Sequence, residues 1–198
     1  YAWGLPSIVR DFPHTLVLDE HPSYLWFLTT YGTTTGQTGH FANKIMQKKG
    51  LPFAAYFSVK MPDTWTPTFD LSNLQKVHRI NLNAEQEIDF VIKKIQSRFA
   101  GDYMRNKVPT ILAKTFYGLE YDAMRRTCHF KVENSCIGCG LCAKNGPVSA
   151  IEIRNKKPVW VKDRCVMCLS CLHHCPKFAI QYENRTKKHG QYTNPNVK

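Results

Sequence analysis

Seven of the eight cysteines in this 198-residue sequence lie between residues 136 and 176, at regular spacing. The second half of the stretch has three cysteines separated by two residues each, then a fourth after three more residues, followed by a proline. These residues are Cys165, Cys168, Cys171, Cys175 and Pro176. This is the spacing of the bacterial iron–sulfur run, in which soft thiolates hold the corners of a cubic cluster.

The first half of the stretch repeats the second at an offset of 29 residues, with Gly146 where the fourth cysteine is expected. In the two-cluster arrangement the last cysteine of each run binds the other cluster. The spacing therefore predicts one complete [4Fe–4S] site, formed by Cys136, Cys139, Cys142 and Cys175. The second site would have only Cys165, Cys168 and Cys171, which predicts a [3Fe–4S] cluster or a [4Fe–4S] cluster with one labile iron. The alternative is that Gly146 is an incidental variant and another ligand substitutes.

Three other uses of these cysteines are weighed against iron. Zinc fits two Cys-x-x-Cys pairs but does not explain a third cysteine at the same spacing in each half. A disulfide framework needs an oxidising compartment, which nothing in the sequence indicates. A Cys–His catalytic pair is disfavoured because His173 and His174 are expected to be exposed loop side chains. Cys128 lies outside the pattern and is expected to be a small buried apolar residue.

Composition and charge restrict the classes of partner. Apolar residues make up 43% of the sequence, which is typical of a globular protein. The net charge is +12, and from residue 128 onward 12 Lys and Arg face 4 Asp and Glu, a net charge of +8. Such charge permits nucleic acid or an acidic membrane as partner, but no nucleic-acid motif accompanies it. We favour one of two explanations for this charge: Lys and Arg offset the negative charge of thiolate-bound clusters, or they dock an acidic redox partner. No membrane span or secretory signal is visible in the sequence.

The elements before the cysteines alternate between strand and helix. Residues 24–31 and 53–59 are continuous apolar, β-favouring runs, which predicts strands buried on both faces of a parallel sheet. A helix is expected before Gly50, and a second between a cap at Asn83 and a stop at Gly101. This alternation predicts α/β architecture.

In the cysteine region each repeat is expected to be a cysteine loop, a helical turn and a short strand. Residues 151–153 and 158–161 would form a hairpin around the polar turn 155–157. We therefore divide the chain into an α/β region at 1–105, a connector at 106–129, and an iron–sulfur domain with a C-terminal tail at 130–198.

Several short segments together resemble the flavodoxin–ferredoxin fusion family, cytoplasmic iron–sulfur flavoproteins with a bacterial-type 2[4Fe–4S] ferredoxin domain. The segments that carry the resemblance, besides the cysteine runs, are residues 1–6, 30–33, 59–62 and 190–195. The resemblance implies a partial, doubly wound flavodoxin-like parallel sheet followed by a small α+β ferredoxin-like domain with two pseudo-repeats. The family's first strand and phosphate loop precede anything in this sequence, so either the sequence is truncated or FMN binding is weak or lost. The missing strand would also leave a buried-type strand exposed as an edge of the sheet.

The resemblance also implies FMN at the carboxyl ends of the strands. The residues that would surround the flavin ring are Tyr1, Trp3, Gly4, Thr30, Tyr31, Gly32, Thr33, Thr34 and Thr35. The alternative is that Trp3 is a core anchor and residues 32–39 are a turn that leads into a helix.

The function that we expect is electron transfer through [4Fe–4S]-type clusters, coupled to an FMN-binding domain and to a partner redox protein. The complete protein would then be a small oxidoreductase. The alternative is a cluster-bearing module that docks a partner and has neither flavin nor substrate chemistry of its own.

Overall fold

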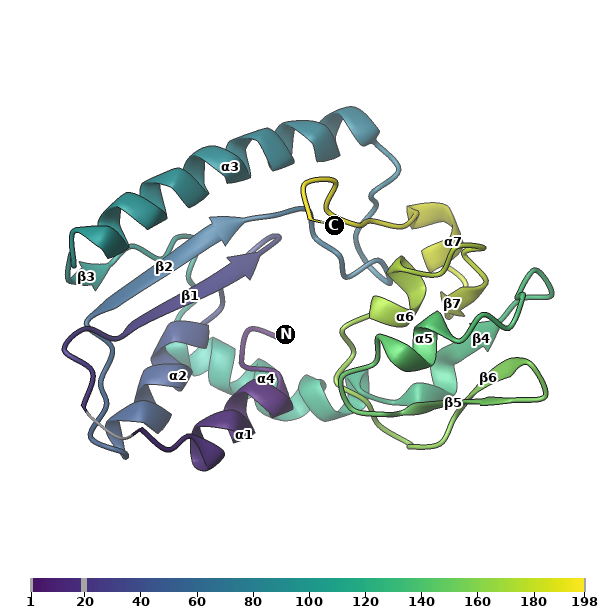
Figure 1. Ribbon diagram of the computed structural model, residues 1–198, viewed down its shortest axis with the longest axis horizontal. Coiled ribbons are helices and arrows are strands. Elements are labelled where there is room, and N and C mark those ends of the chain that lie inside the picture. The colour runs from purple at the N-terminus through teal and green to yellow at the C-terminus, as the bar shows by residue number, and fades with distance from the viewer. Residues whose placement is uncertain (1, 19–20, 198) are drawn as a thin grey trace. The chain divides into compact units, whose positions relative to one another are not determined.

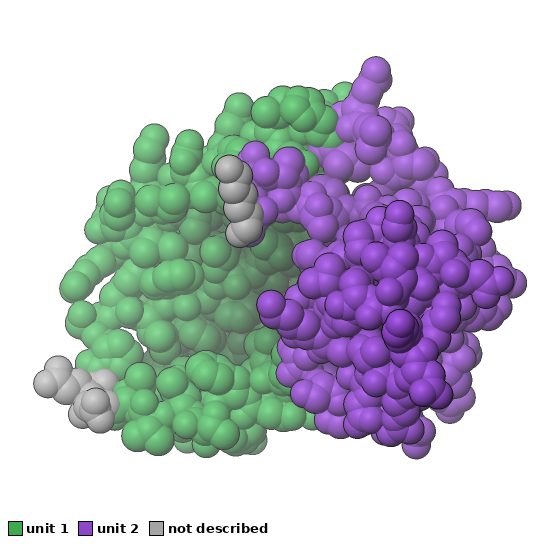
Figure 2. All heavy atoms as spheres, turned by 45° about the vertical axis from the view of Figure 1, so that its right-hand side comes forward, with its two compact units in different colours: residues 1–62, 78–121 green, residues 63–77, 122–198 purple. Residues whose placement is uncertain are grey.

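The computed structural model of the protein describes residues 2–18 and 21–197 (Figure 1). The chain divides into two compact units, coloured separately in Figure 2. Unit 1 is residues 1–62 and 78–121, and unit 2 is residues 63–77 and 122–198. The boundary at residue 121 falls inside the segment 106–129 that the sequence suggested as a connector.

Unit 1 is built on a three-stranded parallel sheet of β1 (Trp26–Tyr31), β2 (Ala55–Lys60) and β3 (Gly101–Asp102), in the order β1-β2-β3. β1 pairs with β2 along its whole length, from Trp26↔Ala55 to Tyr31↔Lys60. β3 adds only two residues beside the start of β2. The predicted parallel pairing of the first two strands is therefore confirmed.

The prediction that both apolar strands are buried on both faces holds for β2 and is wrong for β1. In β2, Phe57 on one face is 0% exposed and Ser58 on the other face is 7% exposed. In β1, Trp26 and Leu28 are 39% and 40% exposed. β1 is the edge of the sheet, and a β-favouring composition cannot report whether another element covers a strand.

Among the described residues four helices accompany the sheet, and Figure 1 shows α3 on one face and α2 and α4 on the other. Small and branched side chains of α3, including Ala84 and Val91, pack on β2. None of the helices in the part of the chain that the structure describes combines the length and apolar character that a membrane span needs. The helices are α1 (Ser7–Thr15), α2 (Thr38–Gln47), α3 (Leu74–Gln96) and α4 (Thr110–Met124).

The predicted start of the long helix at Asn83 is wrong, because α3 begins nine residues earlier. Asn73 precedes the helix, and its Oδ1 accepts a hydrogen bond from the Lys76 backbone N–H at 2.9 Å. This is the contact of an N-cap side chain. Asn83 instead lies inside the helix. Both asparagines fit the cap pattern, and only the contact distinguishes them.

Unit 2 contains two small antiparallel sheets, in which β4 pairs with β7 and β5 pairs with β6. The predicted hairpin is confirmed, although its turn is one residue shorter, since Lys157 already pairs with Arg154. The elements are η1 (Thr127–His129), β4 (Phe130–Val132), α5 (Leu141–Lys144), β5 (Ile151–Arg154), β6 (Lys157–Trp160), α6 (Ser170–His173), β7 (Ile180–Tyr182) and α7 (Thr186–His189).

The segment 63–77, which connects β2 to α3, belongs to unit 2 rather than to the sheet. Trp65 packs against the core of unit 2 and lies 6.1 Å from the ring of Tyr182. The carbonyl of Thr66 bonds to Nδ1 of His189, and the backbone carbonyl of His189 accepts a hydrogen bond from the N–H of Leu71. A segment distant in sequence thus completes the core beside the cysteines.

Candidate metal centres

Four cysteines from the two repeats line one cavity of unit 2. Cys136 and Cys139 lie in the loop before α5, Cys142 lies in α5, and Cys175 follows α6. These are the four residues that the spacing assigned to the complete site. Burial raises the pKa of Cys142, and the neighbouring Cys139 and Cys175 thiols raise it further. The three groups are therefore close enough to interact electrostatically.

The remaining three cysteines of the pattern form a second group. Burial raises the pKa of Cys171, which is 8% exposed, and Cys168 and Cys165 raise it further. The Cys142 thiol of the first group also raises the pKa of Cys171, so the two groups are neighbours. The Cys142 and Cys171 thiols therefore favour the protonated form, and metal binding must displace those protons.

The backbone repeats at the same offset as the sequence. Non-helical residues with positive φ occur at equivalent places in both runs, and α5 and α6 begin at equivalent places too. Alternating left-handed residues of this kind form concavities of backbone N–H groups that bind anions, including iron–sulfur sites. The equivalent pairs are Gly138 and Met167, Gly140 and Leu169, and Ser149 and Phe178.

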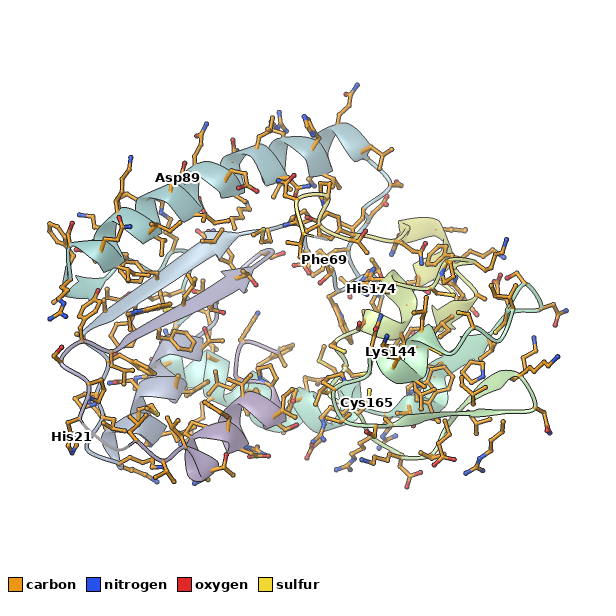
Figure 3. The ribbon with its side chains drawn as sticks, in the orientation of Figure 1. His21, Phe69, Asp89, Lys144, Cys165 and His174 are labelled. Carbon is orange, nitrogen blue, oxygen red and sulfur yellow. The ribbon has the colours of Figure 1, made fainter. Side chains whose placement is uncertain are left out.

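Backbone amides already bond to cysteine sulfur in both groups. The N–H of Met167 donates to Sγ of Cys165 at 3.3 Å, and the N–H of Ala179 donates to Sγ of Cys175 at 3.2 Å. Such bonds favour the thiolate and tune the reduction potential of a cluster bound there. Cys165, labelled in Figure 3, also accepts a bond from Nε of Arg125 through its carbonyl at 2.8 Å.

Gly146 follows the end of α5, and the structure has room for a side chain there. A Cβ placed on it would lie 3.5 Å from the carbonyl oxygen of Cys142 and 3.6 Å from that of Ala143. Both are ordinary van der Waals contacts, and Gly146 does not have a positive φ. The backbone therefore does not require glycine at this position.

The described residues contain no group of three or more His, Cys, Asp and Glu side chains arranged to hold a single metal ion. A multinuclear cluster spreads its thiolates further apart than one ion does. The cavity lined by four cysteines and the amide bonds to sulfur fit such a cluster. All eight cysteines are free, so none is engaged in a disulfide.

His174 is exposed, as expected, but two other expectations about residues near the cysteines are wrong. His173 is only 6% exposed, because segment 63–77 covers it. Its Nε2–H donates to the carbonyl of Thr64 at 2.9 Å, and its Nδ1 accepts from the N–H of Tyr192 at 3.2 Å. Burial lowers its pKa, in keeping with a neutral ring. Cys128, expected to be buried, is exposed. No local sequence signal marks the burial of His173, because it depends on contacts with residues distant in sequence.

The residues expected around a flavin are only partly brought together. Tyr1 lies outside the described residues. The carbonyl of Trp3 accepts a hydrogen bond from the N–H of Gln37 at 3.0 Å, so this segment does adjoin the loop after β1. The Trp3 ring, however, packs on Phe116 with a centroid separation of 4.4 Å. A Cβ on Gly4 would lie 2.3 Å from the ring of Tyr117, which explains glycine there by packing.

The hydroxyls of the same loop are engaged with the chain itself. Thr34 donates to the carbonyl of Asn106 at 2.5 Å, and Thr35 donates to the carbonyl of Arg105 at 2.7 Å. Tyr31 is buried, and its hydroxyl accepts from Asn106 at 3.3 Å. The remaining predicted residues, Thr30, Gly32 and Thr33, are exposed or half-buried at the end of β1.

Comparison with known proteins agrees with the cysteine geometry. Residues 135–179 match the 4Fe-4S dicluster domain family. The chain is also 39% identical over 62 residues to an uncharacterized polyferredoxin-like protein of Methanocaldococcus jannaschii, a match that covers 25% of this chain and 37% of the relative. No solved structure matches significantly. Together with the cysteine geometry, these matches support a ferredoxin-like 4Fe-4S domain within a chain of mixed α/β structure.

Proposed function

We propose that this chain carries single electrons between redox partners through two iron–sulfur clusters held in unit 2. The observation that carries the proposal is the cavity lined by Cys136, Cys139, Cys142 and Cys175, which combines ligands from both repeats. A bound cluster would supply one-electron chemistry. The similarity to a dicluster domain and to a polyferredoxin-like protein supports this function.

The chain's own residues would set how readily the sites accept an electron. The N–H groups of Met167 and Ala179 point at sulfur and stabilise added negative charge. The Arg125 guanidinium also stabilises negative charge near Cys165. Burial raises the pKa of this thiol, and the charge of Arg125 partly lowers it again. Cys171 of the second site is buried, and an environment with little water opposes the addition of negative charge there. The two sites are therefore expected to differ in potential.

We further propose that the second site, with Cys165, Cys168 and Cys171, holds a three-iron cluster or a four-iron cluster with one labile iron. The support is that position 146 provides no side chain.

The experiment is anaerobic reconstitution of the chain with iron and sulfide, followed by quantification of iron, sulfide and zinc. About seven to eight irons per chain, with visible absorption that bleaches on reduction, are expected for two clusters. Electron paramagnetic resonance of the oxidised protein is expected to contain a three-iron signal. Bound zinc without any reducible species would refute the electron-transfer function, and two intact four-iron signals alone would refute the three-iron site.

Coupling to FMN through unit 1 is our second candidate. It is favoured by the contact between Trp3 and the loop after β1, at the carboxyl end of a parallel strand. The residues fit a flavin only in part, because the Thr34 and Thr35 hydroxyls are bonded within the chain. Titration with FMN, followed by quenching of flavin fluorescence, tests this candidate. Saturable quenching would support it. Unchanged fluorescence would refute FMN binding, and the cluster module would then act without flavin.

A further inference from the structure

The cavity lined by the four cysteines opens at a surface with exposed apolar side chains. Ile137 is 59% exposed, Leu141 and Ile153 are each 38% exposed, and Cys139 between them is exposed as well. All of these residues line the cavity. We call this surface the first-site face, because it lies over the site formed by Cys136, Cys139, Cys142 and Cys175. Apolar patches of this kind beside a functional site are typical of the centres of protein interfaces.

Three lysines surround the first-site face. Lys177 lines the cavity, Lys156 contacts Gly138 of the cysteine loop, and Lys144 ends α5 (Figure 3). All three are exposed, and none forms an ion pair with any residue of the described part of the chain. The charge at the rim is therefore available to a partner.

Two glutamates of unit 2 that lie close in sequence to the first-site face are paired with other cations. Glu133 pairs with Lys187 at 2.8 Å, and Glu152 pairs with Arg154 at 2.8 Å. Glu152 and Arg154 alternate with Ile153 along β5, so they lie on the opposite face of the hairpin from the cavity. The first-site face is thus an apolar centre within a positive rim.

Lys156 occupies a backbone position that favours glycine. Asn155 and Lys156 both have positive φ, 49° and 58°, as the two central residues of a tight hairpin turn. A lysine there is disfavoured by its backbone, and its side chain is exposed beside the cysteine loop. Replacement by glycine would remove the charge without straining the turn.

We propose that the first-site face docks a small acidic electron-carrier protein, with the carrier's apolar contact seated over Cys139 and its carboxylates against Lys144, Lys156 and Lys177. The inference rests on the proposed function, since it makes this site the exchange point: one electron leaves the reduced protein and enters the oxidised carrier. Cys139 is exposed, whereas Cys171 in the other group is buried. The positive rim accelerates encounter with an acidic partner, and the apolar centre fixes the final position.

The test uses the full chain with clusters reconstituted, and an oxidised acidic flavodoxin as the probe. The variant Lys156→Gly with Lys177→Gln removes two charges from the rim. Its control, Arg185→Gln with Lys188→Gln, removes one charge just before α7 and one within it, and Figure 1 separates α7 from the β5–β6 hairpin. Binding is measured by calorimetry at low ionic strength, independently of any electron transfer.

We expect the rim variant to bind the flavodoxin at least tenfold more weakly and with less dependence on salt, and the control to change affinity less than twofold. Equal weakening by both variants would mean that net charge alone acts, and would overturn the docking site. Absence of binding by the unmodified chain would overturn it too. Electron transfer to the bound flavodoxin is recorded separately. Binding without transfer would refute the proposed function and leave the docking surface standing.

Discussion

At the scale of single residues, the two cysteine runs differ mainly at Gly146. The repeat extends to backbone conformation, with left-handed residues at Gly138 and Met167, yet only the second run ends in a cysteine. The two-cluster arrangement groups the same four cysteines that line one cavity, and their role as cluster ligands stays a prediction. The roles of His173 and Arg125 could not be predicted, since each depends on partners far along the chain.

Gly146→Cys is expected to complete the second site. The added side chain meets only ordinary contacts at 3.5 and 3.6 Å, so the fold should tolerate it. A fourth thiolate would convert a three-iron or labile site into a stable four-iron site. The three-iron resonance of the oxidised protein should disappear, and iron content should rise toward eight. Gly146→Ser, which fills similar space with a poorer ligand, is the control and should keep the original signal.

Gly138→Ala is expected to destabilise unit 2. A Cβ there would lie 2.5 Å from the carbonyl oxygen of Lys156, and φ is +69°. The hairpin tip or the cysteine loop must then move, at a cost of about 1–3 kcal/mol. The matched control is Gly118→Ala in α4, where nothing lies within 4 Å and helix propensity favours alanine. Anaerobic urea unfolding should separate the two variants, and equal midpoints would contradict the close packing.

For helices, strands and loops, burial and contacts depend on which other elements lie beside them. Residues 24–31 have the composition of a buried strand, but β1 is an edge, with Trp26 and Leu28 exposed. Residues 63–77 show no regular pattern, yet their backbone carbonyls bond to His173 and His189. Local composition predicted the strand itself and the parallel pairing, but burial is a property of the assembled sheet.

Trp65→Ala tests whether segment 63–77 supports the cysteine unit. Trp65 is half-buried against the core that contains Tyr182, and truncation should cost unit 2 about 2 kcal/mol. Thermal loss of the visible cluster absorption should therefore begin at a lower temperature. Trp26→Ala removes the same side chain from the exposed face of β1 and serves as control. If both variants lose their clusters at the same temperature as the unmodified chain, the segment is not part of that core.

At the scale of the whole molecule, the cysteine unit has both a packed core and metal ligands. Eight buried residues, among them Leu172 and Ile180, form that core beside the thiols. Cluster binding is expected to add folding free energy, as metals do in small domains. The parallel sheet of unit 1 was predicted from alternating patterns, while its relation to flavin stays a prediction.

We propose that one cluster is held jointly by both repeats, through Cys136, Cys139, Cys142 and Cys175. The most direct measurement is the iron content and reduced-state resonance of Cys175→Ser, compared with Cys128→Ser, whose cysteine is exposed and outside the pattern. We predict that Cys175→Ser loses or alters the four-iron signal while Cys128→Ser keeps both clusters. A Cys175→Ser protein with unchanged iron and an unchanged spectrum would contradict the shared site.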